Sequence, residues 1–283
     1  MPQTSSHAVG LIGRGIAASQ SPQIHEGAAR ELGLALTYRI VDFDALGLED
    51  DRLEEIVRLL AGIGWTGCNI THPFKQQVLA FCDELSEDAR VLGAANTLLF
   101  HNGRIRGENT DWIGFSSLIA KRIGDIGGQA IAQIGTGGAG SATAYALARL
   151  GAAEVALYDP SPARCDQLVA RLAPGFANCR FVVCTSAAEA IGGRRGIVQT
   201  TPVGMAAHPG MPFDPALLDG AEWLADVIYF PAETALMAAA RQRHITAVNG
   251  LDMVIGQAAE AFRLFTGHVP DEAQMHRALP GQS

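Results

Sequence analysis

Polar side chains gather at the end of an apolar segment in GCNITHPFKQ, residues 67–76. Asn69 and Thr71 lie where this predicted strand ends, and Lys75 follows closely. Ligands bind at the carboxyl ends of strands in open α/β sheets, and lysine is one of the side chains that transfer protons in active sites. Pro73 predicts a first helical turn that contains Lys75, where an ammonium opposes the helix dipole and a purely structural choice would favour an acid. The run therefore predicts a ligand site; the alternative is an ordinary solvated lysine.

A candidate acidic partner for Lys75 is Asp111, in GENTDWIG, residues 107–114. Asp111 follows Thr110 and opens a predicted long helix, so the helix dipole helps to keep its carboxylate ionised. The alternative is a helix-start acid with no further role. The sequence by itself does not bring Lys75 and Asp111 together.

A glycine-rich turn follows the apolar segment AIAQIG, residues 130–135. Gly135, Gly137 and Gly140 have the spacing G-x-G-x-x-G and precede a helical pattern. In such turns the first glycine permits the tight turn, the second lets the backbone approach a pyrophosphate, and the third lets helix and strand pack closely. The helix N-terminus adds free N–H groups and a partial positive charge. A turn that only packs well is the alternative, but the matching strand, helix and later acid predict a dinucleotide site.

The later acid is Asp159, which ends the predicted strand EVALYD, residues 154–159. A carboxylate at this place accepts hydrogen bonds from the adenosine ribose hydroxyls and repels the 2′-phosphate of NADP. Pro160 follows and offers no donor, whereas Arg164 would still be able to accommodate a phosphate. We therefore predict NAD as the cofactor, with NADP disfavoured.

The stretch SQSPQIHEGAARELG, residues 19–33, carries the signals of a helix start and stop. Ser21 fits the N-cap, Pro22 the first helical position and Gly33 the C-terminal stop. Ser19 and Ser21 would present two hydroxyls at the positive end of that helix, which suits a small anion. The alternative is ordinary capping, which needs Ser21 alone.

Bulk properties exclude several classes of partner. Lys+Arg total 21 against Asp+Glu 29, so the net charge is −8, and no basic cluster suits nucleic acid or a membrane surface. Five cysteines without a C-x-x-C pair indicate reduced thiols, and no metal site is expected. The N-terminus has no signal-peptide pattern, and no apolar run approaches the ~18 residues of a membrane helix. We expect a cytoplasmic monomer or homodimer whose partner is a small-molecule substrate.

Short apolar runs alternate with amphipathic helical patterns, which predicts a parallel α/β architecture. The expected strands are residues 8–13, 36–42, 65–70, 130–135, 154–159, 180–185, 196–200, 222–229 and 244–249. Helices are expected from Pro22, over 49–62, from Pro73, over 111–124, over 252–265 and over 271–279. A hairpin is expected over residues 96–107, because Asn102-Gly103 suits a type I′ turn.

Several short motifs occur in an order that resembles one known family. They are SQSP (19–22), GCNITHPFK (67–75), LGAANT (92–97), GENTD (107–111), TPVGM (201–205) and GLDMVIGQAAEAF (250–262). Together they resemble the shikimate/quinate dehydrogenase family over nearly the whole chain, and most closely its NAD-using quinate/shikimate branch. The resemblance implies an α/β substrate-binding catalytic domain of residues 1–110 plus 250–283, to which the last helices return. It implies a Rossmann NAD-binding domain of residues 111–249.

The resemblance also implies a role for each matching residue. Lys75 and Asp111 form the catalytic pair. The implied substrate ligands are Ser19, Ser21, Asn69, Thr71, Asn96, Tyr229 and Gln257. The implied cofactor ligands are Gly135, Thr136, Gly137, Gly138, Ala139, Asp159, Arg164, Thr201, Val203, Val227 and Gly250.

The implied reaction is reversible hydride transfer between C3 of shikimate and C4 of the nicotinamide, with Lys75 carrying the hydroxyl proton. NADP-dependent members have Asn-Arg-Thr where this chain has residues 159–161, Asp-Pro-Ser, which again favours NAD. The NAD-using branch often has Ser-x-Thr where this chain keeps Ser19-x-Ser21, which counts against full use of quinate. Quinate or an aminated shikimate analogue is the alternative substrate. A non-catalytic sensor of NAD or shikimate is the alternative class of protein, which the loss of Lys75 or Asp111 would have favoured.

Overall fold

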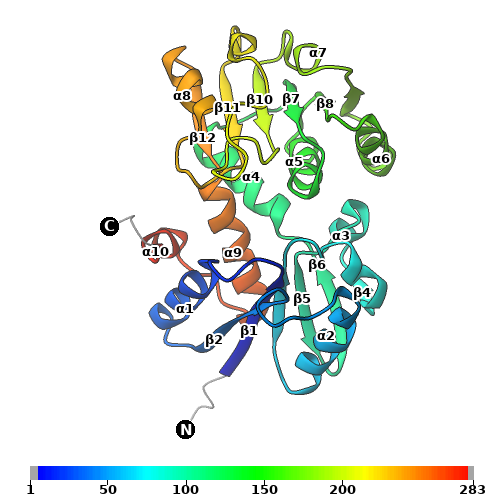
Figure 1. Cartoon of the computed structure of the whole chain (residues 1–283), viewed down its shortest axis with the longest axis vertical. Helices are drawn as coiled ribbons and strands as arrows, with labels where there is room; N and C mark the ends of the chain where they lie inside the picture. The colour runs from blue at the N-terminus through cyan, green and yellow to red at the C-terminus, as the bar shows by residue number, and fades with distance from the viewer. Residues whose placement is uncertain (1–5, 280–283) are drawn as a thin grey trace. The chain divides into compact units, whose positions relative to one another are not determined.

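The computed structural model describes residues 6–279, and Figure 1 traces the chain from blue at the N-terminus to red at the C-terminus. The chain divides into two compact units. Unit 1 comprises Met1–Thr110 and Ile255–Ser283, and unit 2 comprises Asp111–Val254. The chain therefore leaves unit 1 after Thr110 and returns to it inside its penultimate helix.

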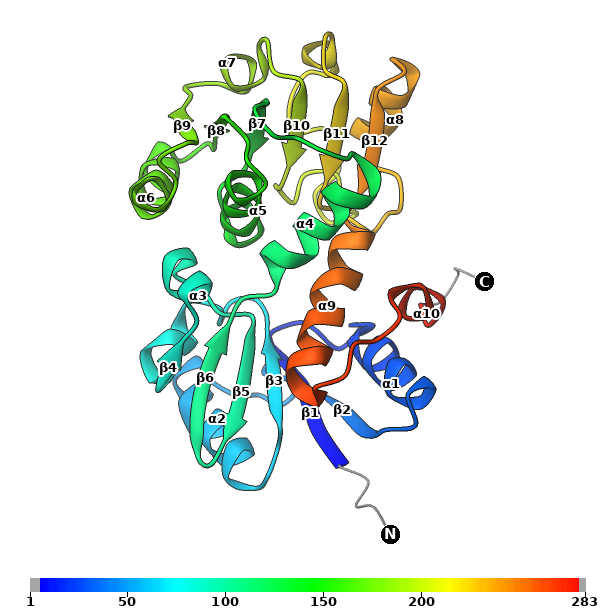
Figure 2. The ribbon, with the colours of Figure 1, turned by 180° about the vertical axis from the view of Figure 1, so that it is seen from behind.

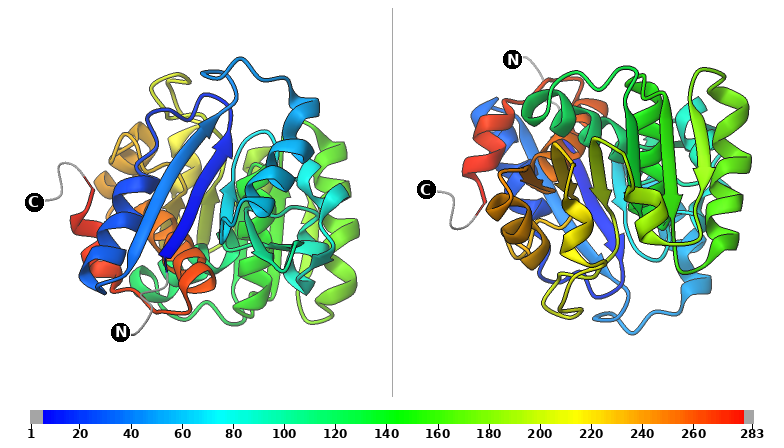
Figure 3. Two further views of the ribbon diagram at one scale, coloured as in Figure 1. Left: turned by 90° about the horizontal axis from the view of Figure 1, so that it is seen from below. Right: turned by 90° about the horizontal axis from the view of Figure 1, so that it is seen from above.

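Unit 1 is built on a six-stranded sheet with the order β2-β1-β3-β5-β6-β4. Its strands are β1 (Ser6–Gly13), β2 (Ala35–Asp42), β3 (Gly67–Ile70), β4 (Glu84–Leu85), β5 (Thr97–His101) and β6 (Arg104–Glu108). β1 pairs in parallel with β2 and β3, and the left view of Figure 3 shows β1 and β2, in blue, running the same way. β5 is antiparallel to β3 and to β6. The α/β class is as predicted, with a hairpin that makes this sheet mixed rather than parallel.

The hairpin between β5 and β6 turns at Asn102 and Gly103. Both residues have positive φ, 50° and 76°. A type I′ turn needs positive φ at both central positions, and Asn-Gly is the pair that adopts it most readily. The hairpin prediction is confirmed, and the turn fixes the register in which Thr97 faces Glu108.

Helices pack on both faces of the unit 1 sheet because side chains alternate along β1. Ile12 belongs to one apolar cluster, with Leu53 of α2, whereas Val9 belongs to another, with Phe265 of α9. The helices of this unit are α1 (Ser21–Glu31), α2 (Leu53–Gly62), α3 (Glu87–Leu92), α10 (Glu272–Arg277) and most of α9 (Leu251–Thr266), with 3₁₀ turns η1 (Asp50–Arg52) and η2 (Gln77–Phe81). α1 and α10 lie side by side, as Figures 1 and 2 show.

The segment after β3 differs from the prediction. Phe74 is fully buried and packs on Phe43 with ring centroids 4.7 Å apart. A turn closed by the bond from Phe74 N–H to Thr71 C=O, 2.9 Å, places that ring in the core. The His72–Pro73 peptide is cis, and helical structure begins only with the 3₁₀ turn at Gln77. The prediction of a helix from Pro73 was therefore wrong.

Unit 2 is built on a six-stranded parallel sheet with the order β12-β11-β10-β7-β8-β9. Its strands are β7 (Ala130–Ile134), β8 (Glu154–Tyr158), β9 (Arg180–Val183), β10 (Gly196–Gln199), β11 (Trp223–Asp226) and β12 (Thr246–Asn249). Numbered from β7, this is the Rossmann order, with the switch point between β7 and β10 where such sheets bind ligands. The predicted strands of this half are all present.

The helices of unit 2 complete the fold around this sheet. They are α4 (Asp111–Arg122), α5 (Gly138–Arg149), α6 (Pro162–Leu172), α7 (Ala187–Ile191) and α8 (Ala235–Gln242), with 3₁₀ turns η3 (Ala173–Gly175) and η4 (Pro215–Leu218). One apolar cluster joins Ile134 of β7, Ile197 of β10 and Met237 of α8. Across residues 6–279, none of the helices has the length and apolar character that crossing a bilayer would require.

Candidate functional site

Three of the residues predicted to bind substrate, Asn69, Asn96 and Gln257, lie in one largely buried hydrogen-bonded cluster of unit 1. Asn69 Nδ2 donates to Thr97 Oγ1 at 3.0 Å, and Thr97 Oγ1 donates to Asn96 Oδ1 at 3.1 Å. Asn96 Nδ2 in turn donates to Thr110 Oγ1 at 3.0 Å. A longer contact of 3.5 Å joins Thr110 Oγ1 to Gln257 Oε1. The structure thus brings Asn69, Asn96 and Gln257 together from β3, the start of β5 and α9.

Lys75 is anchored beside this cluster through its backbone. Its carbonyl oxygen accepts the N–H of Ala95 at 2.8 Å, one residue before Asn96. Lys75 lies in the turn after β3 rather than at the N-terminus of an α-helix, so the predicted opposition to a helix dipole does not apply. Thr71, half-buried at the end of β3, donates its N–H to Ile12 C=O at 3.0 Å.

Asp111 follows the same cluster in the chain. The N–H of Thr110 donates to Asn96 Oδ1 at 2.7 Å, and Asp111 then opens α4 with an exposed fraction of 8%. Thr110 is the last residue of this part of unit 1, and Asp111 is the first of unit 2. The side-chain pairing of Lys75 with Asp111 stays a prediction.

The serine pair occupies the start of α1, but not as a helix cap. The helix begins at Ser21 itself, and the N-cap residue Gln20 makes no side-chain cap bond, so the predicted N-cap role of Ser21 was wrong. Ser19 Oγ instead donates to Ser21 Oγ at 3.1 Å and accepts Ser21 N–H at 3.3 Å. Both half-buried hydroxyls therefore lie together at the positive end of a helix, which suits an anion.

A buried carboxylate fixes the loop that carries the serines. Asp42 accepts the N–H of Gly15 at 3.0 Å and of Ile16 at 2.8 Å. Burial by itself raises the pKa of Asp42, but these backbone N–H groups, with those of Asp44 and Ala45, bring the pKa below its ordinary value. Asp42 is therefore ionised at neutral pH and holds the loop after β1.

Sequence analysis missed the residues that connect these groups. Tyr38 of β2 is 3% exposed, and its hydroxyl donates to Asn69 Oδ1 at 2.9 Å. Thr97 and Thr110 lie inside the motifs LGAANT and GENTD, yet no role was assigned to either. Tyr38 carries no local signal of its own, because an aromatic residue within an apolar strand is ordinary core material.

The glycine turn of unit 2 has the geometry that a pyrophosphate requires. Gly135 has a φ of 101°, and a Cβ at Gly140 would stand 2.5 Å from Gly135 O. A Cβ at Gly137 or Gly138 would meet nothing within 4 Å. α5 begins at Gly138 with no side-chain cap bond, so its first N–H groups have no capping side chain. The turn and the helix start, which include Ala139, therefore fit the phosphates of a dinucleotide.

Asp159 lies directly beyond β8, facing this turn. Its Oδ2 accepts both the N–H of Thr136 at 2.9 Å and Thr136 Oγ1 at 3.1 Å, and its Oδ1 accepts Ser161 N–H at 2.9 Å. Burial raises the pKa of Asp159, but these donors and the charge of Arg164 bring it below the ordinary value. The carboxylate is thus ionised and held in place where the adenosine ribose is expected.

Three further predicted cofactor ligands, Thr201, Val203 and Val227, are hydrogen-bonded to the buried residue Gln199. Gln199 Nε2 donates to the carbonyl oxygens of Thr201 and Val203, both at 3.0 Å, and Gln199 C=O accepts Val227 N–H at 2.9 Å. A Cβ at Gly250 would lie 2.0 Å from Val227 O, so only glycine fits there. Gln199 is a further residue that sequence analysis missed.

Tyr229 lies on the loop beyond β11, not in the strand that was predicted to reach it. It is 51% exposed. Asp226, at the end of β11, holds the base of this loop by accepting Ile228 N–H at 3.1 Å and Thr234 Oγ1 at 2.8 Å. The predicted contact of Tyr229 with substrate stays a prediction.

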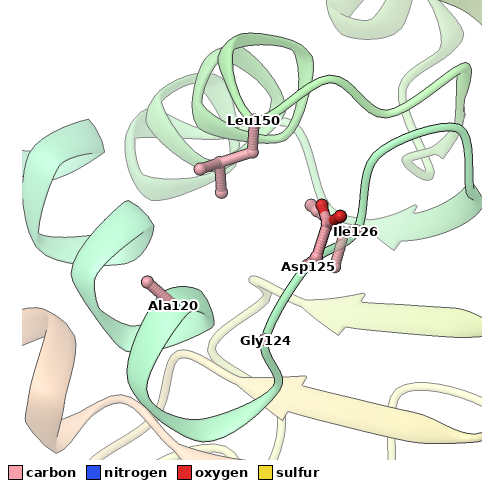
Figure 4. A pocket seen from close by; sticks show the side chains of 5 residues that line it. All are labelled: Ala120, Gly124, Asp125, Ile126 and Leu150. Carbon is pink, nitrogen blue, oxygen red and sulfur yellow. The ribbon is translucent and has the colours of Figure 1, made fainter.

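A hollow of about 300 Å³ lies between the ends of α4 and α5, away from all these groups. Figure 4 shows its lining, Ala120, Gly124, Asp125, Ile126 and Leu150. None of them is a predicted site residue. Among residues 6–279, no group of three or more His, Cys, Asp or Glu side chains is placed to hold a metal ion.

A Rossmann-ordered sheet with a glycine turn and a fixed acid defines an α/β protein of the dinucleotide-binding class. Comparison with known proteins gives the family. The model of the shikimate dehydrogenase substrate binding domain matches residues 11–98, and that of the shikimate 5′-dehydrogenase C-terminal domain matches residues 250–279.

Similar full-length proteins carry two names. A shikimate dehydrogenase (NADP(+)) of Arthrobacter sp. (strain FB24) is 41% identical over 275 residues, which cover 96% of this chain and 94% of the relative. A quinate/shikimate dehydrogenase (NAD(+)) of Corynebacterium efficiens is 38% identical over 270 residues, 94% of this chain and 95% of the relative. The solved quinate dehydrogenase of Corynebacterium glutamicum in complex with NAD superposes with a TM-score of 0.90 at 37% identity, covering 96% of this chain and 98% of that one. The chain belongs to the shikimate/quinate dehydrogenase family.

Proposed function

We propose that the chain is a shikimate dehydrogenase, which interconverts shikimate and 3-dehydroshikimate with a nicotinamide dinucleotide. The observation that carries this proposal is the cluster of Asn69, Asn96, Thr110 and Gln257 beside the anchored backbone of Lys75. Amide and hydroxyl groups that point in several directions suit a ring with several hydroxyls. The family indicates the reaction, and the cluster is the proposed binding site of its substrate.

The proposed orientation of the substrate follows from two groups of polar residues in unit 1, the serine pair and the amide cluster. Ser19 and Ser21 bind its carboxylate, and Tyr229 of unit 2 contributes at that end. Asn69, Thr71, Asn96 and Gln257 bind the ring hydroxyls. Because the chain as a whole is acidic, with a net charge of −8, the anion is attracted by these local donors and by Lys75 rather than by overall charge.

Lys75 and Asp111 carry the proton chemistry in this proposal. The nicotinamide, when bound, supplies the acceptor for the hydride. The uncharged amine of Lys75 takes the proton that the substrate hydroxyl loses, and the ammonium so formed returns a proton to the carbonyl oxygen in the reverse direction. Asp111 orients the ammonium and the hydroxyl. Residues 1–110 with 250–283 act as the substrate domain, and residues 111–249 as the nucleotide domain.

The role of Lys75 is tested by removing its ammonium. Lys75→Ala is expected to lower kcat by about 10² or more, with little change in the Kd of the nucleotide. The chain's other lysine offers a matched control, because Lys121 is exposed near the end of α4. Lys121→Ala should keep wild-type turnover. Turnover close to wild type in Lys75→Ala would remove Lys75 from the mechanism.

We also propose that NAD is preferred over NADP. Asp159 supports this preference, because an ionised carboxylate held by Thr136 and Ser161 repels a 2′-phosphate. Arg164 is the opposing feature. The Arthrobacter relative is named for NADP(+), so the preference of this chain is tested by comparing kcat/KM for the two cofactors. A kcat/KM for NADP above that for NAD would refute the proposal.

Quinate is the second candidate substrate. It is favoured by the superposition with the Corynebacterium glutamicum quinate dehydrogenase at a TM-score of 0.90. Initial rates with shikimate, quinate and an aminated shikimate analogue, each against NAD and NADP, separate the candidates. No turnover of any of them would refute the dehydrogenase proposal and favour a non-catalytic sensor.

A further inference from the structure

The hydroxyl of Tyr38 lies where the two parts of the unit 1 site meet. It donates to Asn69 Oδ1 at 2.9 Å, and both residues are buried, 3% and 6% exposed. The ring is fixed independently of this bond, because it stacks on His25 of α1 with centroids 4.6 Å apart. Burial raises the pKa of Tyr38, and hydrogen bonding with Ser21 opposes that rise. The hydroxyl therefore lies near Ser21 as well as being bonded to Asn69.

The bond from Tyr38 and the backbone carbonyl of Asn96 together fix which way the Asn69 amide points. An amide has one accepting and one donating end, and these ends are distinguished only by their partners. With Oδ1 occupied by Tyr38, Asn69 Nδ2 is directed to Thr97 Oγ1 at 3.0 Å and to Asn96 O at 3.4 Å. Thr97 has one hydroxyl proton, and it goes to Asn96 Oδ1 at 3.1 Å.

The orientation of Asn69 is thereby passed on to Asn96. If the Asn69 amide were reversed, its oxygen would face Thr97 and compete for the proton that Asn96 Oδ1 now accepts. Asn96 Oδ1 also accepts Thr110 N–H at 2.7 Å, and Asn96 Nδ2 donates to Thr110 Oγ1. The donor at Tyr38, together with Asn96 C=O, thus holds the whole cluster in one of two hydrogen-bond arrangements.

We propose that Tyr38 is a positioning residue of the substrate site, which holds the amides of Asn69 and Asn96 in the orientation that receives the substrate's ring hydroxyls. This role rests on the proposed function, because it concerns the same site. Tyr38 acts through Asn69 and does not itself touch the reacting atoms. Its effect therefore belongs to substrate binding, not to the chemical step.

The test is Tyr38→Phe, which keeps the stacked ring and removes the donor. A buried acceptor left without its partner is costly, and we expect KM for the substrate to rise about tenfold or more. The kcat at saturating substrate and the Kd of the nucleotide should stay within about threefold of wild type. A loss of folding would lower the active fraction and kcat with it, so the split between KM and kcat distinguishes positioning from instability.

Two further variants complete the experiment. Tyr145→Phe is the matched control, because Tyr145 is a 3% exposed tyrosine in α5 of unit 2, and KM should not change. Thr97→Val cuts the same cluster one bond further along and should raise KM in the same way. The double variant with Tyr38→Phe and Thr97→Val should then show a rise in KM that is smaller than the product of the two single rises.

The outcomes separate this inference from the proposed function. An unchanged KM in a folded Tyr38→Phe variant, in an enzyme whose wild type turns over its substrate, overturns the inference alone. A lowered kcat with unchanged KM also overturns it. A wild type inactive on shikimate and quinate overturns the proposed function instead. If Tyr38→Phe shows no cooperative melting, the KM of Thr97→Val decides.

Discussion

His25 provides a pH-dependent weakness in unit 1 that a single substitution should remove. The residue lies in α1, is 1% exposed and packs among Tyr38, Phe262 and Phe265. Its Nδ1 has no hydrogen-bond partner within residues 6–279. Burial lowers the pKa of His25 from 6.5 to about 3, because the imidazolium would lose its hydration without gaining an acceptor.

The sign and size of the effect follow from linkage. The folded pKa lies below the unfolded value, so the unfolded chain binds a proton between these pH values and the folded chain does not. The free energy of unfolding is then fully present above pH 6.5 and falls as the pH drops toward 3. Because pH 5 lies about 1.5 units below the unfolded pKa, the free energy of unfolding is lower there by roughly 2 kcal/mol than at pH 8.

The perturbation is His25→Phe, which keeps an aromatic ring in an aromatic pocket and removes the titrating group. Urea unfolding at pH 8, 6 and 5, followed by circular dichroism, measures the free energy of unfolding of both proteins. We expect a difference in favour of His25→Phe that grows by about 2 kcal/mol from pH 8 to pH 5. His208→Gln, which removes an exposed imidazole, controls for the change in histidine content. Wild type and His25→Phe curves that stay parallel from pH 8 to pH 5 would refute the reasoning, because His25 would then be charged in the folded state.

Two further predictions concern unit 2. Burial raises the pKa of Asp226 from 3.8 to about 6, so the free energy of unfolding of the wild type falls as the pH rises through that window. Relative to the wild type, the free energy of unfolding of Asp226→Asn should therefore rise by up to about 3 kcal/mol between pH 4 and pH 8. The same difference between the two proteins at both pH values, measured by urea unfolding, would contradict this. Thr136→Val removes one of the donors that hold Asp159 and should weaken NAD binding several-fold in calorimetry, since a hydrogen bond to a charged group is lost. Thr185→Ala is its control, because Thr185 donates N–H and hydroxyl to Glu189 in the same way on the surface, and equal Kd values in all three proteins would remove Thr136 from cofactor binding.

The features that sequence predicted correctly depend on residues close together in the chain. Gly135 has a φ of 101°, and a Cβ at Gly140 would meet the carbonyl oxygen of Gly135, so both needs for glycine arise within one short turn. Asn102-Gly103 specifies its hairpin turn for the same reason. Strand positions in unit 2 follow from short apolar runs. Such signals are visible in any window of the sequence that contains them.

The errors and omissions depend on distant partners. Helical signals from Pro73 gave way to the burial of Phe74 against Phe43, a contact across thirty-one positions that no local pattern contains. The exception is Ser21, whose predicted N-cap role failed although its hydrogen-bond partner, Ser19, is only two residues away. Tyr38 and Asn69 lie in different strands, and the bond between them appears only once the sheet is assembled.

The positions of the main chain in the unit 1 site depend on two adjacent residues, Ala95 and Asn96. Ala95 N–H fixes Lys75 C=O, and the next residue, Asn96, fixes Thr110 N–H. Asp111 is joined to Thr110 by a peptide bond, so the main chains of both proposed catalytic residues are tethered to the adjacent positions 95 and 96. A substitution that disturbs residues 95 and 96 should therefore impair Lys75 and Asp111 together and lower kcat, whereas Tyr38→Phe should mainly raise KM.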